Sequence, residues 1–336
     1  MGNIFQRKKV KGKRQKQAAR FLLFPFSFFL IFAFCLFSAA FAQQGWSKVS
    51  TIREGGQEAT INALFYNGNH LWLVGADGLV KRSYDEGRTF HDANVGVSAG
   101  LNDVFLKGDR MWVVGDEGTI LLSTDGGRSF VKSLYSAGSN RSAATDLYSV
   151  QFINDRTGFI VGDAGLILRS DDGGVSWREQ KSGTDAQLFH LSFKENRGWV
   201  VGTGGRILHT YDGGRNWYSQ QSGTTEDLNR VYQVTDRIVL ITGNNGTLLR
   251  TENGGATWQK IPLRITDPLF GISFIDKKTG WVVGYNGHII RTYDGGRNWV
   301  EQHSETGTDL FAVSFHKNLG FAIGRDGLVM KYYERQ

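Results

Sequence analysis

The eight residues TYDGGRNW occur twice in this chain, at 210–217 and 292–299, and four further copies share their pattern. Each copy reads Ser or Thr, any residue, Asp or Asn, any residue, Gly, two variable residues and an aromatic residue. The other copies lie at 83–90, 123–130, 170–177 and 251–258. A pattern that returns at a regular interval indicates a fold built by stacking similar units.

A second signal, an apolar or Thr residue followed by Gly, precedes each copy and occurs once more near the C-terminus. Its members are Gly75, Gly115, Gly162, Gly202, Gly243, Gly284 and Gly324, spaced 40, 47, 40, 41, 41 and 40 residues apart. Each unit also holds an alternating segment such as LFGISF and an apolar segment such as GWVVG, which predict short strands. Four strands in about 40 residues, repeated in this way, predict an all-β, seven-bladed β-propeller of four-stranded blades.

The two ends of the repeat series predict how the ring closes. The seventh unit, LFAVSFHKNLGFAIGRDGLVMKYYERQ, stops before its Gly-Gly-x-x-Trp segment, whereas GWSKVS at 45–50 carries a Trp but has no unit of its own. We therefore expect 45–50 to complete the last blade beside strand 328–333, with Trp46 packed against that blade and Val49 within the same sheet. Such sharing removes exposed sheet edges.

The repeated octet has a structural interpretation. Its acidic residue can accept hydrogen bonds from turn amides and from the Ser or Thr hydroxyl, and its glycines suit the positive φ angles of a tight turn. Its aromatic residue begins the outer strand and packs between blades. The Gly-x-x-Gly segments, such as GDAG and GYNG, predict β-turns rather than phosphate loops, because no helix follows them. The acidic or amide positions of the octet are Asp85, Asp125, Asp172, Asp212, Asn253 and Asp294.

Charge and hydropathy separate residues 1–42 from the rest. Eight Lys or Arg and no Asp or Glu lie there, which leaves 31 basic and 32 acidic residues in the remainder of a chain whose net charge is +7. The near-neutral remainder argues against a nucleic-acid partner. A basic stretch, the apolar run 21–42 and the sequence Ala40-Phe41-Ala42 predict a signal peptide cleaved before Gln43, followed by one domain at 43–336. The alternative is an uncleaved membrane anchor.

The octet resembles the Asp box, or BNR repeat, of sialidases and related propellers. The fuller unit LFxVSF…GWVVGxxGxIIRTxDGGxxW, which recurs over 45–336, is more specifically similar to the photosystem II stability/assembly factor family. This resemblance implies an exported, non-enzymatic propeller that binds a protein client, such as a membrane protein or membrane complex. It also implies a location in the periplasm, the thylakoid lumen or the extracellular space, with membrane association if the leader is retained.

The resemblance further suggests residues that contact a client, because surface arginines are implicated in holding the client in that family. The position before the octet holds Arg82, Arg169, Arg250 and Arg291, and a second set at the octet turns comprises Arg88, Arg128, Arg215 and Arg297. The alternative for the first set is pairing with acidic residues of the next blade. The opposite blade ends bring another candidate set to the mouth of the channel: Asp116, Asp163, Asn244, Tyr285 and Arg325.

The alternative function is a carbohydrate-binding or sialidase-like, glycan-processing propeller, which the Asp boxes alone suggest. The Arg-Ile-Pro signature of sialidases is absent, and the prolines are Pro25, Pro262 and Pro268. The seven histidines show no spacing typical of metal ligands, and the single cysteine, Cys35, lies in the predicted leader. We therefore expect no metal, no cofactor and no catalytic residue, and a monomer that binds protein.

Overall fold

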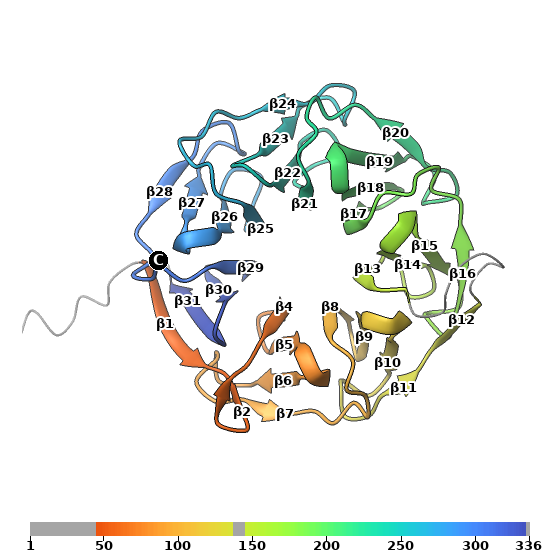
Figure 1. The fold of residues 1–336 in the computed structure, drawn as a ribbon, viewed down its shortest axis with the longest axis vertical. Coiled ribbons are helices and arrows are strands. Elements are labelled where there is room, and N and C mark those ends of the chain that lie inside the picture. The colour runs from red at the N-terminus through yellow and green to blue at the C-terminus, as the bar shows by residue number, and fades with distance from the viewer. Residues whose placement is uncertain (1–44, 137–144, 334–336) are drawn as a thin grey trace, which may run out of the picture. The chain divides into compact units, whose positions relative to one another are not determined.

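Seven β-sheets surround a central axis in the residues that the computed structural model describes, 45–136 and 145–333 (Figure 1). The predicted signal segment at 1–42 lies outside these ranges. The all-β, seven-bladed propeller predicted from the repeat is confirmed. Within the described ranges, no helix is long and apolar enough to cross a membrane.

Each blade runs outward from the axis through antiparallel strands, and blades are numbered here from the one that begins with β4. The innermost strands are β4 (Ile61–Tyr66), β8 (Leu101–Lys107), β13 (Leu147–Phe152), β17 (Leu188–Lys194), β21 (Leu228–Gln233), β25 (Leu269–Phe274) and β29 (Leu310–His316). The second strands are β5 (Leu71–Gly75), β9 (Arg110–Gly115), β14 (Gly158–Gly162), β18 (Arg197–Gly202), β22 (Val239–Gly243), β26 (Gly280–Gly284) and β30 (Leu319–Gly324).

The outer half of each blade carries the octet. The third strands are β6 (Val80–Ser83), β10 (Ile120–Ser123), β15 (Ile167–Ser170), β19 (Arg206–Thr210), β23 (Leu248–Thr251), β27 (Ile289–Thr292) and β31 (Leu328–Tyr333). The outer strands are β7 (His91–Asp92), β11 (Val131–Lys132), β16 (Ser176–Gln180), β20 (Tyr218–Gln220), β24 (Gln259–Lys260), β28 (Val300–Gln302) and, in blade 7, β1 (Gly45–Thr51).

The second strands are buried almost throughout, because neighbouring blades cover both faces of each sheet. Trp72, Trp112, Trp199 and Trp281 occupy these strands and are at most 1% exposed. This two-sided burial explains why segments such as GWVVG are continuously apolar, whereas the innermost strands alternate. The core is therefore a ring of seven apolar layers between blades, and each layer needs both of its neighbours.

The glycine that ends each second strand is required by a close approach of the backbone. A Cβ atom on Gly75 would overlap the carbonyl oxygen of Thr60, and the equivalent contact recurs in all seven blades. In the turn that follows, Asp77 and Gly78 have φ angles of 55° and 69°. Two consecutive positive φ angles define a type I′ hairpin turn. The turns that contain 3₁₀ segments are η1 (Ala76–Gly78), η2 (Asp116–Gly118), η3 (Asp163–Gly165), η4 (Thr203–Gly205) and η5 (Tyr285–Gly287).

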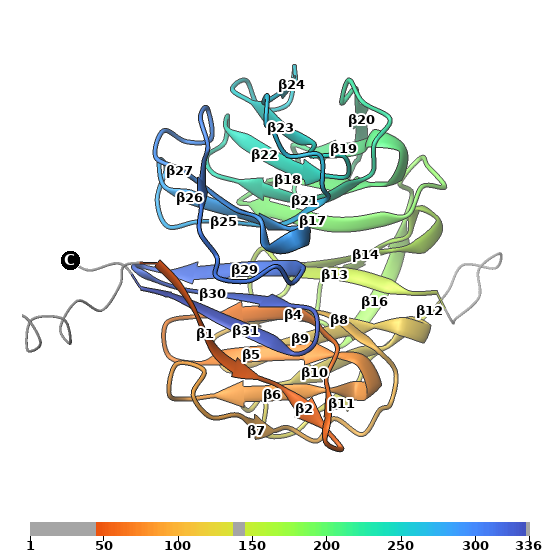
Figure 2. The same ribbon diagram turned by 60° about the vertical axis from the view of Figure 1, so that its left-hand side comes forward.

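The ring closes as the sequence predicts. β1 pairs antiparallel with β31 (Figure 2). In this register Trp46 lies opposite Tyr332. The ring of Trp46 is centred 5.3 Å from that of Tyr332 and 5.7 Å from that of Phe315, and Trp46 is 3% exposed. Val49 lies within β1, at the one shift in its register with β31. One sheet thus joins segments from opposite ends of the described chain.

Blade 3 differs from the predicted four strands, because β12 (Leu134–Ser136) pairs in parallel with β16 as a fifth, outermost strand. The longer interval of 47 residues between Gly115 and Gly162 supplies the extra chain. The middle of this connection, 137–144, lies outside the described residues. A short hairpin of β2 (Arg53–Glu54) and β3 (Gln57–Glu58) follows β1 before blade 1 begins.

The octets lie at the end of each blade that also carries the hairpin between first and second strands, and we call this end the Asp-box face. The hydrogen bonds predicted for the octet are present. In blade 3, Asp172 accepts bonds from the Ser170 hydroxyl at 2.8 Å and from the Ser176 amide at 3.0 Å. Gly174 has a φ of 88°, and a Cβ there would overlap Trp112 of the preceding blade. The octet therefore closes a turn and packs on its neighbour.

Candidate functional site

The four arginines that directly precede an octet lie on separate blades and do not form one cluster. Three of them reach across a blade boundary to a carbonyl oxygen in the next octet turn, at 2.8–3.1 Å: Arg82 to Gly126, Arg169 to Gly213 and Arg250 to Gly295. Blade 7 has no octet, and Arg291 donates instead to the Tyr332 hydroxyl at 2.7 Å. Among the described residues, each of these hydrogen bonds thus reaches a backbone or hydroxyl oxygen of the next blade, and Arg169 and Arg250 also pair with Asp171 and Glu252 of their own blades.

Burial limits what these arginines can offer to a client. Arg250 is 5% exposed and Arg291 is 3% exposed. The guanidinium of Arg291 lies 4.4 Å from the ring centre of Trp281 and is stabilised by that cation–π contact. These contacts join blades, and the role of the four arginines in client binding stays a prediction.

The five candidates at the channel mouth occupy equivalent positions, the first residue of each inter-strand turn. Four of the five form a hydrogen bond with a neighbouring side chain. Three accept one, from Asn102 to Asp116 at 2.8 Å, from Tyr148 to Asp163 at 2.8 Å and from Asn229 to Asn244 at 3.1 Å. The fourth, Arg325, donates to Asp309 at 2.6 Å. Tyr285 packs against Phe270, with ring centres 5.0 Å apart. Burial and the Asp163 carboxylate raise the pKa of Tyr148. The structure places the five residues at one face, each bound to its own neighbour.

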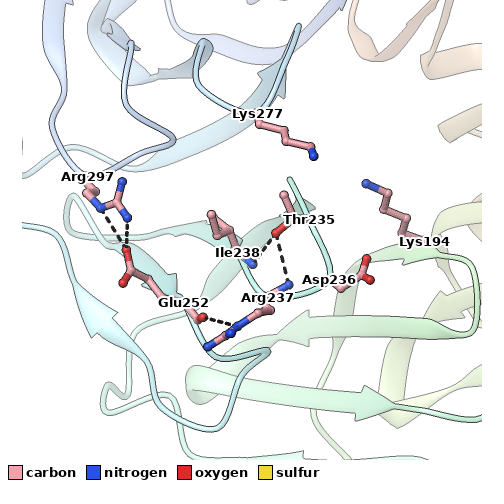
Figure 3. Close-up of a pocket in the computed structure, with 8 residues that line it drawn as sticks. All are labelled: Lys194, Thr235, Asp236, Arg237, Ile238, Glu252, Lys277 and Arg297. Atoms are coloured by element: carbon pink, nitrogen blue, oxygen red, sulfur yellow. Dashed lines mark hydrogen bonds and ion pairs between the residues drawn. The ribbon is translucent and has the colours of Figure 1, made fainter.

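A groove of about 550 Å³ opens on the Asp-box face across blades 4, 5 and 6 (Figure 3). Its walls are the ends of first strands, the hairpins that follow them and the octet turns of blades 5 and 6. We call it the basic groove. Its lining residues are Lys194, Thr235, Asp236, Arg237, Ile238, Glu252, Lys277 and Arg297.

Tight turns fix the backbone of this groove. The Thr235 hydroxyl oxygen accepts hydrogen bonds from the amides of Arg237 at 3.3 Å and Ile238 at 3.0 Å. In blade 6, Asp276 accepts amide bonds from Lys278 at 2.6 Å and Thr279 at 2.8 Å. Such side-chain acceptors stabilise turns locally. Burial raises the pKa of Asp276, but these amides outweigh it, so the pKa falls below its ordinary value.

The groove carries four cationic and two acidic side chains. Glu252 accepts hydrogen bonds from Arg250 at 2.6 Å and from Arg297, and the Arg250 bond is the main cause that lowers the pKa of Glu252. Glu252 is therefore ionised and compensates the Arg297 guanidinium. Lys194 and Lys277 point toward one another above the turn at Thr235 (Figure 3), and within the described chain neither forms an ion pair. The groove is left with an excess of positive charge suited to a carboxylate-bearing segment.

Three of the groove cations, Lys194, Arg237 and Lys277, are absent from the residues that the sequence pattern singles out. Their signal lies in the hairpins between first and second strands, which read KENR, TDR and DKK in blades 4, 5 and 6. Only Arg297 belongs to a predicted set, the arginines of the octet turns. The adjacency of three blades, rather than any one motif, assembles the groove.

Comparison with known proteins gives one matching family. The sequence model of the family described as "Photosynthesis system II assembly factor YCF48" matches residues 93–171, 171–271 and 256–334. A search of the curated proteins finds no match.

Solved structures with the same fold include proteins named YCF48. "YCF48 from Cyanidioschyzon merolae" is 20% identical, with a TM-score of 0.70, over 86% of this chain and 98% of that one. "YCF48 bound to D1 peptide" is 19% identical, with a TM-score of 0.71, over 88% and 96%. A GH74 enzyme from Niastella koreensis is 16% identical, with a TM-score of 0.65, over 85% of this chain and 53% of the enzyme. Identities this low show the shared fold.

Proposed function

The chain belongs to the photosynthesis system II assembly factor YCF48 family, and from this premise we propose that it is a non-enzymatic scaffold that binds an acidic segment of a protein client in its basic groove. The observation that carries the proposal is the excess positive charge of that groove. Lys194 and Lys277 face one another across an open surface on the described part of the chain, with no carboxylate paired to either. The Lys194 ammonium donates to the Val234 carbonyl oxygen at 3.4 Å, and an exposed cation that is not paired with a carboxylate is available to carboxylates of another molecule.

A structural relative supports a peptide as the ligand. One protein with this fold has been solved as "YCF48 bound to D1 peptide". A rigid ring of blades offers a preformed surface to such a segment. The propeller therefore loses little conformational entropy when the segment binds. For the present chain we propose an extended acidic segment of a membrane protein or membrane complex as the client.

Peptide binding tests this proposal directly. The probe is a fluorescent 12-residue peptide of alternating Glu and Ser, compared with the same peptide carrying Gln in place of Glu. Fluorescence anisotropy should show binding of the Glu peptide that weakens as salt rises, because screening weakens contacts between exposed charges. Lys194→Glu with Lys277→Glu should weaken it about tenfold or more, since two attractive contacts become repulsive.

The control is Lys132→Glu, an exposed lysine on β11 of blade 2, away from the groove. This variant replaces one lysine by glutamate, whereas the double variant replaces two, and it should leave peptide binding nearly unchanged. Equal affinity for the Glu and Gln peptides, or an unchanged affinity in the double variant, would contradict the proposed function.

The glycan-processing alternative rests on the Asp boxes. In this structure their acidic residues accept hydrogen bonds from their own turns, as Asp212 does from Thr210 and Asn216. Those bonds assign the carboxylates to turn formation. Turnover of a fluorogenic sialoside by the purified protein would favour the alternative over the scaffold.

We also propose that the protein is exported and that its leader is removed before Gln43. The basic, apolar and small-residue order of 1–42 supports this. N-terminal sequencing of the protein recovered outside the cytoplasm should begin near Gln43. Recovery of 21–42 in carbonate-washed membranes would instead identify an anchor.

A further inference from the structure

The third residue of the innermost strand differs in chemical type from blade to blade. Blades 6, 7 and 1 carry Gly271, Ala312 and Ala63 at this position, whereas the consecutive blades 2 to 5 carry four polar residues. The polar set is Asp103, Ser149, His190 and Arg230. Because the seven innermost strands surround the axis (Figure 1), the four polar residues lie on consecutive blades on one side of the ring, and the three small residues lie on the other blades.

A central cavity of about 230 Å³ lies at this level and is lined by residues from all seven innermost strands. The polar set contributes to its wall. One water needs about 10–15 Å³ of such space, and drug-sized ligands occupy pockets of about 300–1,000 Å³. The cavity therefore suits a ligand of a few non-hydrogen atoms.

Asp103 is already satisfied within the protein. One of its carboxylate oxygens accepts the Ser149 hydroxyl at 2.9 Å and the Val150 amide at 3.0 Å, and the other accepts the Val104 amide at 2.9 Å. Burial raises the pKa of Asp103, while the charge of Arg230 and these three donors oppose that rise. On balance the pKa of Asp103 is raised, and its carboxyl group contributes structure to the cavity but few free acceptor positions.

Arg230 lines the same cavity with its donors unused. Among the described residues its guanidinium has no hydrogen bond or ion pair, and Asp103 is the group whose charge favours its ionised form. A guanidinium stays protonated in proteins, and that of Arg230 is half-buried at the cavity wall. An acceptor bound in the cavity would satisfy its free donors and would be attracted by its charge.

His190 supplies a further donor beside Arg230. The Val231 amide donates to Nδ1 of His190 at 3.5 Å, which leaves the proton on Nε2. Burial lowers the pKa of His190 well below its ordinary value, and the Arg230 charge adds to this effect. The imidazole is then neutral at pH 7, and its Nε2–H is a hydrogen-bond donor.

We propose that the central cavity binds a small monocarboxylate through a bidentate bond from Arg230 and a hydrogen bond from His190. The planar guanidinium fork matches a carboxylate group. The single guanidinium balances one negative charge, so a dianion such as succinate is disfavoured. Leu64, Ile272 and Val313 line the cavity from blades 1, 6 and 7 and can contact the apolar remainder of the ligand.

The test uses sodium propionate as the probe and the purified protein. The unfolding temperature should rise with propionate to a plateau, since a ligand that binds the native state stabilises it. Sodium chloride at equal ionic strength should produce no such plateau, and succinate should act only at higher concentration. Arg230→Met should weaken the propionate response at least tenfold, and Arg230→Lys, which keeps the charge, should weaken it less.

The matched control is Arg250→Met, a buried arginine of the same blade whose donors bind Gly295 and Glu252. It should destabilise the protein but leave the concentration dependence on propionate unchanged. Carbon-13 NMR of carboxyl-labelled propionate with the unmodified protein gives a second measurement that needs no variant. A tripeptide with a free C-terminus and its amide show whether a peptide end can supply the carboxylate. No propionate response, or the same response in Arg230→Met or in chloride, would overturn the proposal.

Discussion

At the scale of single residues, the octet carboxylate acts as an acceptor inside its own turn. Asp172 is bound by the Ser170 hydroxyl and by the amide of Ser176. Burial raises its pKa, but these donors outweigh burial and lower the pKa of Asp172 to about 2. A carboxylate whose pKa falls on folding stabilises the native state wherever it is ionised.

The sign of the pH effect follows from that direction. The stabilisation is complete above the ordinary Asp pKa of about 4 and is lost as pH falls through about 2. Asp172→Asn should therefore reduce the loss of stability between pH 4 and pH 2, with about one proton fewer taken up on unfolding. Thermal unfolding from pH 7 to pH 2 measures this difference.

The chain contains a precedent for that substitution. Asn253 occupies the same position in blade 5, where it accepts the Thr251 hydroxyl and the Thr257 amide, and donates its own amide to the Thr257 hydroxyl. In Asp172→Asn, the Ser176 hydroxyl can accept a hydrogen bond from the new amide, as the Thr257 hydroxyl does from Asn253. An unchanged pH dependence in Asp172→Asn would contradict the low pKa of Asp172.

At the scale of the element, each octet turn is also a contact between blades. The second glycine of the octet lies against a side chain of the preceding blade: Gly127 on Trp72, Gly174 on Trp112 and Gly214 on Phe159. A side chain at these positions would collide with the aromatic core of the neighbour. The glycine thus meets two requirements, a left-handed backbone and close packing.

Gly174→Ala and Gly183→Ala separate those two requirements. Their φ angles are similar, 88° and 74°, but a Cβ at Gly183 meets no atom within 4 Å, whereas one at Gly174 overlaps Trp112. Both variants carry the backbone cost of about 1–2 kcal/mol. Gly174→Ala should cost about 1–3 kcal/mol more, because it also overpacks the blade interface. Urea unfolding gives both values, and equal losses would show that packing adds nothing.

At the scale of the whole molecule, the shared sheet of blade 7 holds the ring together. β1 is hydrogen-bonded to β31, and the chain continues from β1 into blade 1, so the bonds of one sheet link the first and last blades. Trp46 fills the apolar layer between blades 6 and 7, with Trp281 and Phe315. Opening this sheet would expose an edge and an apolar face at once.

Trp46→Ala tests the closure. It should destabilise the protein by about 3–5 kcal/mol, the range for truncating a buried Trp. Trp217→Ala, at the comparable place in blade 4, should cost less because that ring is only partly buried. Denaturant unfolding compares the two variants. A smaller loss for Trp46→Ala than for Trp217→Ala would show that closure depends little on this side chain.

The fold was predictable from the sequence because the repeat encodes it locally. The octet, the apolar-Gly signal and the orphan Trp46 segment each reflect a contact that recurs in nearly every blade, and a contact made several times leaves a periodic trace. The fifth strand of blade 3 was not predictable, because β12 pairs through chain that the repeat does not specify.

The candidate sites belong to the tertiary structure. Lys194 and Lys277 lie about two units apart in the sequence and meet only because blades 4 to 6 are adjacent in a closed ring. Asp103, His190 and Arg230 share a cavity for the same reason. The sequence by itself determined the blade, its turns and its closure, since those depend on neighbours within one unit or the next. Only the closure of the ring decided which blade-specific residues face one another. Such contacts join residues that differ between blades, so they leave no periodic pattern in the sequence.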